Sequence, residues 1–165
     1  MNTARFQGGI AAIIRSSTDN RYLLLKRSPD KDFQPEIWEC VTGRVEQGEG
    51  FEDALYREVL EEIGVKPEID FLVGTTHFYR GDSIPENELL GIVYCCSLAE
   101  PYKIKISNEH TTYKWCTATE AMKFLEPHGA NSEWIMKVIS RCEELIRLSP
   151  RNFGNAPTDT SLELG

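Results

Sequence analysis

Three glutamates lie close together near the middle of this 165-residue chain, within the run Arg57-Glu58-Val59-Leu60-Glu61-Glu62. On a helical wheel of about 100° per residue, Glu62 falls ~40° and Glu61 ~60° from Glu58, so the three project from one side. Like charges at this spacing destabilise a helix by roughly 0.2–0.5 kcal/mol per pair. A hard divalent cation would offset that repulsion, because carboxylate oxygens are ligands that Mg²⁺ and Mn²⁺ prefer.

The residues around the glutamates also suit a metal site. Arg57 flanks the acidic side, where its guanidinium can hold a carboxylate through two hydrogen bonds. Glu49, just before the helix, can in turn hold Arg57, and such contacts orient metal ligands from outside. Gly43 and Gly48 permit a tight turn into the helix, where a backbone carbonyl can be one more oxygen ligand. Since phosphates often complete the shell of Mg²⁺, the pattern indicates metal-assisted attack of water on a phosphoryl centre.

An isolated acidic cluster of this kind is more often a solvated, salt-bridged helix face, but here it belongs to a longer pattern. The pattern has nine fixed positions, which are filled here by Gly43, Glu49, Arg57, Glu58, Val59, Glu61, Glu62, Gly64 and Val65. This pattern resembles the Nudix box, the motif of the Nudix hydrolases. Agreement at nine positions in register favours the metal site over the solvated face.

The resemblance implies an activity and a set of roles. Nudix hydrolases split a nucleoside diphosphate linked to another group, using Mg²⁺ or Mn²⁺. By position, Glu58 and Glu62 would be the main metal ligands, with Glu61 as a ligand or close support. The Gly43 carbonyl would be a further ligand, and the arginine and glutamate of the motif, Arg57 and Glu49, would orient these groups.

Two further segments narrow the resemblance to one group of the family. Val41-Thr42-Gly43 and the run Glu109-His110-Thr111-Thr112-Tyr113-Lys114-Trp115 resemble the bacterial dATP pyrophosphohydrolases, also called dihydroneopterin triphosphate pyrophosphatases. In that group the glutamate of the second segment lies on a loop facing the box helix. Glu109 would then be a further metal ligand or the general base. Three more matches would contact the substrate: Arg27, Arg5 and Thr42.

The expected reaction is Mg²⁺-dependent cleavage of a (deoxy)nucleoside triphosphate, or a related triphosphate, to a monophosphate and pyrophosphate. Hydrolysis of another NDP-X compound, such as a nucleotide sugar or dinucleoside polyphosphate, stays open, because loops 30–37 and 80–88 do not follow the group. A non-catalytic, nucleotide-sensing Nudix domain is the third alternative. Such domains often lose box glutamates, and this chain keeps them all.

Several other residues have a chemical and an ordinary interpretation. His110 could be a base, although a structural hydrogen bond beside the loop is the better prediction. The run His77-Phe78-Tyr79 could stack on a base or pterin, or simply cover the core at the end of a strand. Glu86 and Glu88 are rivals of Glu109 for the additional acidic role, and the glutamate-histidine context favours Glu109.

Composition limits the classes of partner. The net charge is −8, from 18 basic and 26 acidic residues, so the chain should bind nucleic acid poorly and take a small nucleotide as its partner. The five cysteines lack zinc-binding spacing and are expected to be reduced and mostly buried. No apolar run suits a signal peptide or membrane span, so a cytoplasmic protein is expected. The sequence leaves the oligomeric state, including a homodimer, open.

The elements that must position these residues follow from hydrophobic patterning. Strands are expected over residues 9–16, 22–26, 38–41, 69–79, 89–98, 102–106 and 113–116, and helices over 53–63, 119–125 and 132–148. The first helix should pack through Leu55, Tyr56, Val59, Leu60 and Ile63. This order predicts an α+β fold, a layered α/β/α sandwich with a mixed sheet, which the resemblance also implies. Residues 1–148 should form one domain, followed by a flexible tail over 149–165.

Overall fold

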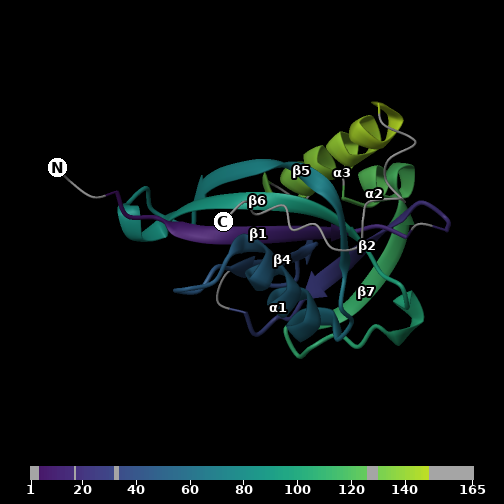
Figure 1. Cartoon of the computed structure of the whole chain (residues 1–165), viewed down its shortest axis with the longest axis horizontal. Helices are drawn as coiled ribbons and strands as arrows, with labels where there is room; N and C mark the ends of the chain where they lie inside the picture. The colour runs from purple at the N-terminus through teal and green to yellow at the C-terminus, as the bar shows by residue number, and fades with distance from the viewer. Residues whose placement is uncertain (1–3, 17, 32–33, 126–129, 149–165) are drawn as a thin grey trace.

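Two β-sheets form the centre of the molecule. The computed structural model describes residues 4–16, 18–31, 34–125 and 130–148, and Figure 1 shows its elements. The sheets have the strand orders β4-β1-β6-β5 and β3-β2-β7. The strands are β1 (Gln7–Ile14), β2 (Arg21–Arg27), β3 (Trp38–Glu39), β4 (Val41–Arg44), β5 (Glu68–Tyr79), β6 (Glu88–Ser97) and β7 (His110–Thr117).

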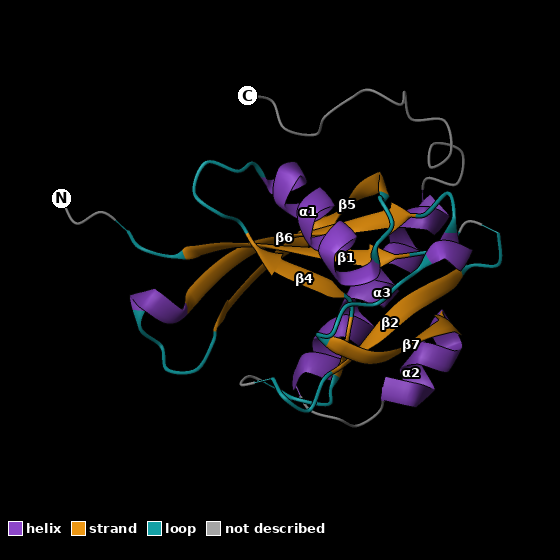
Figure 2. Ribbon diagram, turned by 90° about the horizontal axis from the view of Figure 1, so that it is seen from below, coloured by secondary structure: helices purple, strands orange, loops and turns teal. Residues whose placement is uncertain are grey.

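The larger sheet is mixed, as predicted. β1 pairs in parallel with β6 and antiparallel with β4, while β5 pairs antiparallel with β6. The smaller sheet is antiparallel, with β2 between β3 and β7. Figure 2 shows β2 beside β7. Because β1 is a central strand buried on both faces, its sequence is almost continuously apolar.

Helices cover both faces of the larger sheet. The helix α1 (Phe51–Ile63) lies on one face, and α2 (Ala118–Leu125) and α3 (Ala130–Leu148) lie on the opposite side (Figure 1). Successive residues of β1 point to alternate faces. Thus Ile10 and Ala12 pack in the apolar cluster that includes α1, whereas Ala11 and Ile13 pack in the cluster that includes α3. The predicted α+β sandwich is confirmed.

The C-terminal end of α1 agrees with the sequence, but the helix begins at Phe51, two residues before the expected start, and its faces differ from the wheel in two places. Gly64 has a left-handed φ of 70° and its N–H bonds to the Leu60 carbonyl, which is the predicted stop. Leu60 was expected to pack, yet it is 54% exposed. Glu62 was placed on the separate acidic side, yet it is only 7% exposed. A wheel describes one helix alone, whereas burial also depends on the segments that fold over it.

One such segment replaces a predicted strand. Residues 102–106 do not form a strand: a short 3-10 helix, η2 (Pro101–Lys103), is followed by a loop. The N–H of Lys105 donates to the Ile63 carbonyl and that of Ser107 to the Glu62 carbonyl, both at 2.9 Å. These bonds satisfy carbonyls that the last turn of any helix leaves free. The loop therefore caps α1 and covers its last turn.

The strand expected over residues 38–41 is divided between the sheets. Glu39 pairs with Leu25 of β2, whereas Val41 pairs with Ala12 of β1, so the chain changes sheet at Cys40. The chain thus leads directly from Glu39 in one sheet to Thr42 and Gly43 in the other.

Other expectations concern the cysteines, the loops and the tail. All five cysteines are unpaired and buried, as predicted. Loop 80–88 contains a short 3-10 helix, η1 (Pro85–Asn87). None of the described helices is long and apolar enough to span a bilayer. The tail expected over 149–165 lies outside the described residues.

Candidate active site

Glu58 points from α1 onto the backbone of β4. A Cβ atom at position 43 would approach the side chain of Glu58 more closely than the 3.0 Å that Cβ atoms keep from other heavy atoms. Gly43 therefore makes room for this carboxylate. Burial raises the pKa of Glu58, the neighbouring Glu61 adds to the shift, and Arg57 opposes it.

Arg57 joins Glu49 to Glu58. Its Nε donates to Glu49 Oε1 at 2.7 Å and its Nη2 to Glu49 Oε2 at 2.9 Å, so the paired contact expected with a carboxylate of the helix is made with Glu49 instead. Its Nη1 donates to Glu58 Oε1 at 2.8 Å, and its Nη2 also reaches the Arg44 carbonyl at 2.9 Å. This bonding lowers the pKa of Glu49 to about 2. Glu61 is held less closely, at 3.5 Å from Nη1, and its side chain is 60% exposed.

Glu62 is buried, and no lysine or arginine among the described residues forms an ion pair with it. The backbone of Thr42 lowers the pKa of its carboxyl group. Its Oε2 atom is buried and has no hydrogen-bond partner in the described part of the chain. Burial is the main reason that its pKa is raised well above the usual value, and the charges of Glu39, Glu58 and Glu109 add to the shift. A buried carboxylate oxygen without a partner is costly unless a cation or donor reaches it.

A buried polar chain, not predicted from the sequence, lies next to Glu62. Nη1 of Arg27 donates to both oxygens of Glu39, at 3.1 and 3.2 Å. Nε2 of His110 is 3.0 Å from Glu39 Oε1 and 3.8 Å from Glu62 Oε2. Glu39 is 6% exposed. The sequence did contain a sign of this role for Glu39, a lone acidic residue between Trp38 and Cys40 in a short apolar strand. A charged residue in such a strand is usually buried only when it has a paired partner.

The structure brings Glu109 to the box helix, on the loop that caps α1. Its carbonyl accepts from the Ser28 N–H at 2.8 Å, and its carboxylate forms an ion pair with Lys31. Arg5, predicted to contact the substrate, is exposed in the segment before β1. Arg27, predicted to do the same, is engaged by Glu39.

The oxygen atoms of these residues are of the type that binds a hard cation, although the side chains are not arranged around a common centre. No three His, Cys, Asp or Glu side chains among the described residues are arranged as ligands in their present positions. Glu58 is instead turned towards Arg57. The partnerless Oε2 of Glu62, the carboxylates of Glu58 and Glu61 and the carbonyl of Gly43 are hard oxygen donors on α1 and β4, and Mg²⁺ and Mn²⁺ prefer such donors.

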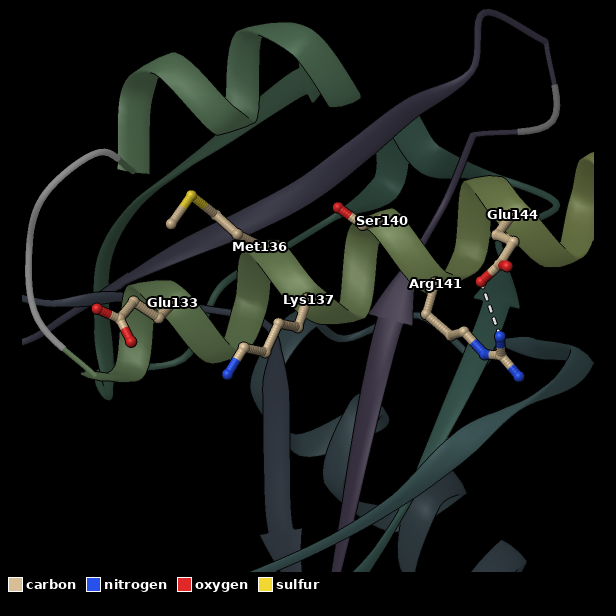
Figure 3. A pocket seen from close by; sticks show the side chains of 6 residues that line it. All are labelled: Glu133, Met136, Lys137, Ser140, Arg141 and Glu144. Carbon is tan, nitrogen blue, oxygen red and sulfur yellow. Dashed lines mark hydrogen bonds and ion pairs between the residues drawn. The ribbon is translucent and has the colours of Figure 1, made fainter.

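Two surface hollows lie away from these carboxylates. The one in Figure 3 is lined by six side chains that all belong to α3, including the ion-paired Arg141 and Glu144, on the opposite side of the sheet from α1. The other lies where Phe51 meets β5 and β6, beside His77. His77 is 3.0 Å from Glu88, one of the rival acidic residues, and packs edge-to-face on Tyr79, so these side chains already have partners.

Comparison with known proteins identifies the family. The NUDIX domain model matches residues 5–137. The chain belongs to the Nudix family. This Nudix protein is 30% identical over 123 residues to the dihydroneopterin triphosphate diphosphatase of Escherichia coli K12, covering 68% of the chain and 79% of that protein. It is also 30% identical over 104 residues to nucleoside triphosphatase NudI of Escherichia coli O139:H28, covering 59% and 73%.

Structural similarity agrees on the fold. The E. coli dihydroneopterin triphosphate pyrophosphohydrolase superposes with a TM-score of 0.58 at 24% identity, covering 82% of this chain and 98% of that one. With the box and the hydrolase relatives, the protein is a Nudix hydrolase, an enzyme that hydrolyses phosphoanhydrides. Enzymes of this family use divalent metals.

Proposed function

We propose that this Nudix hydrolase cleaves a (deoxy)nucleoside triphosphate or a related triphosphate to a monophosphate and pyrophosphate, with Mg²⁺ or Mn²⁺. The observation that carries the proposal is the buried Glu62, one oxygen of which has no partner among the described residues. Beside it, Arg57 binds Glu58 and is itself bound by Glu49. The 30% identity to a triphosphate diphosphatase supports this class of substrate.

The glutamates of α1 and the turn before it would hold the cation. Glu58 and Glu62 would be its main ligands. Glu61 would be a further ligand or would support the ligands closely, and the Gly43 carbonyl would supply one more oxygen. When bound, the cation neutralises phosphate oxygens and lowers the pKa of the attacking water.

Glu109 would accept the proton of the attacking water. Its loop is fastened to the last turn of α1 through the Ser107 N–H, and its carboxylate is 48% exposed on the side chain, so solvent and substrate can reach it. In this role it would exchange Lys31 for the water.

Three residues would contact the substrate. Thr42 lies next to Gly43 on β4, and its backbone lowers the pKa of Glu62. Arg27 can bind phosphate only with the part of its guanidinium that Glu39 leaves free. Arg5 would reach the substrate from the segment before β1.

The site assignment is tested by removing single charges. We expect Glu58→Gln and Glu62→Gln to lower kcat by at least about 100-fold, and Glu109→Gln by about 10- to 100-fold, because ligands and a base are lost. Glu133→Gln, an exposed residue of α3, is the matched control and should leave kcat unchanged. Near wild-type turnover of both Glu58→Gln and Glu62→Gln would show that the site lies elsewhere.

The substrate class is tested by product analysis. Triphosphates, nucleotide sugars and dinucleoside polyphosphates would each be incubated with enzyme and Mg²⁺. Release of pyrophosphate and a monophosphate from triphosphates supports the proposal. Preferential cleavage of the other compounds to two phosphorylated organic products would favour an NDP-X hydrolase instead.

A further inference from the structure

The buried chain Arg27–Glu39–His110 ends beside the unpartnered oxygen of Glu62. Its contacts are 3.1 and 3.2 Å from Arg27 to the two oxygens of Glu39 and 3.0 Å from Glu39 to His110. The next gap, from His110 Nε2 to Glu62 Oε2, is 3.8 Å and too long for a hydrogen bond. The chain therefore stops one step short of Glu62.

The proton position on His110 follows from its neighbours. The Glu39 oxygen that lies 3.0 Å from Nε2 also accepts from Arg27, and a carboxylate bound to a guanidinium accepts and does not donate. Nε2 must therefore carry a hydrogen, and this holds for neutral and charged imidazole alike. This hydrogen is donated to Glu39 Oε1, which is nearer to Nε2 than Glu62 Oε2 is.

Glu39 and Glu62 thus compete for one donor, and Glu39 holds it. Glu39 is itself fixed by Arg27, whose side chain is only 16% exposed. If Glu39 were absent, a small rotation would bring Nε2–H onto Glu62 Oε2, because 3.8 Å exceeds a hydrogen bond by less than 1 Å. That bond would occupy the oxygen which the proposed cation needs.

We propose that Glu39 is a positioning residue that keeps the His110 donor away from Glu62 and so leaves Glu62 Oε2 free to bind a divalent cation. The inference rests on the proposed function, since it gives a purpose to the free oxygen. It also gives a role to the buried Glu39 of the two-residue strand β3, at the edge of the smaller sheet. Groups that orient metal ligands from outside commonly change metal affinity by about 10- to 100-fold.

The test compares Mn²⁺ affinity of the full-length protein by calorimetric titration up to millimolar Mn²⁺, without substrate. We expect Glu39→Ala to weaken binding about tenfold or more. Adding His110→Phe, which keeps the ring but removes the donor, should return the affinity to within about threefold of wild type. Glu39→Gln keeps an acceptor for His110 and should bind nearly as wild type. If Glu39 acted only through its charge, Glu39→Gln would fall like Glu39→Ala and the double variant would stay weak, which overturns the proposal.

A second measurement needs no variant that leaves Arg27 unpaired. In ¹H–¹⁵N spectra of the wild-type protein, His110 should appear protonated at Nε2 with a hydrogen-bonded proton, assigned by its loss in His110→Phe. A neutral ring protonated at Nδ1 alone would overturn the inference even if Glu39→Ala did not fold. Unchanged Mn²⁺ affinity in a folded Glu39→Ala would also overturn it while leaving the proposed reaction, tested through Glu58 and Glu62, unaffected.

Discussion

The carboxyl group of Glu58 lies against the backbone of Gly43, in the space that any side chain at position 43 would fill. Glu58 belongs to α1 and Gly43 to β4, so this contact joins the helix to the strand that precedes it. In the proposed site, the Glu58 carboxylate and the Gly43 carbonyl would be two hard oxygen ligands of one cation. The glycine of the motif is thus explained by a close approach of two groups and not by an unusual φ.

Substitution of Gly43 should displace Glu58. A methyl group there overlaps the glutamate, so we expect Gly43→Ala to lower kcat by about 100-fold or more, with a smaller loss of stability as the side chain rotates away. Gly74→Ala is the matched control, because a Cβ at Gly74 meets no atom within 4 Å. Turnover would be measured alongside unfolding in urea. Equal loss of activity in both variants would contradict this explanation.

Arg57 should be needed for its shape as well as its charge. Lysine cannot reproduce the paired bonds to Glu49 together with the bond to Glu58. We expect Arg57→Lys to lower kcat by about 10- to 100-fold with a modest change in KM. The control is Arg141→Lys, since Arg141 binds a single glutamate on the surface of α3 and should tolerate lysine. Steady-state kinetics of both variants would decide.

A divalent cation should stabilise the fold in a pH-dependent way. Burial, and the repulsion of neighbouring carboxylates, raise the pKa of Glu58 and Glu62 in the metal-free protein. A cation binds their ionised forms, so binding displaces protons and must weaken as pH falls through these raised pKa values. At 100 times its Kd the cation should add about 2.7 kcal/mol to the free energy of unfolding.

The measurement is thermal unfolding with and without Mg²⁺ or Mn²⁺ at pH 6 and pH 8. The increase in Tm should be larger at pH 8 and should disappear in Glu62→Gln. An increase in Tm that is the same at both pH values, or that survives the substitution, would place the cation at other ligands.

Asp70 predicts a separate pH effect, away from the carboxylates of α1. Burial raises its pKa to about 6, against the opposing effect of the hydrogen bond from Ser97 Oγ at 2.9 Å. Between pH 4 and 6 the folded state then binds more protons than the unfolded state, so stability falls as pH rises through that range. We expect Asp70→Asn to be more stable than wild type by about 2 kcal/mol at pH 7 and to lose this advantage near pH 4. Urea unfolding of both proteins across that range measures the difference.

Local sequence could predict the elements that depend on local chemistry. The stop of α1 at Gly64 and the buried strand in the apolar run that begins at Gly9 are confirmed, because a left-handed cap and a short apolar run are properties of local sequence. The strand expected over residues 102–106 was wrong because its backbone donors find partners on α1. A β-rich composition does not reveal which acceptors a loop will meet in the fold.

By itself the sequence determined the family, because the spacing of Gly43, Glu49 and the motif glutamates matches the Nudix box, and it predicted the contact of Arg57 with Glu49. Only the tertiary structure decided that Glu62 is buried with a free oxygen and that Glu39 and His110 stand beside it. The physical reason is that hydrogen bonds and burial join residues 71 positions apart, such as Glu39 and His110, through the packing of strands from a common sheet. The periodicity of a helix or strand does not predict contacts between such distant residues. The motif, in contrast, spans only the end of β4, the loop that follows and α1.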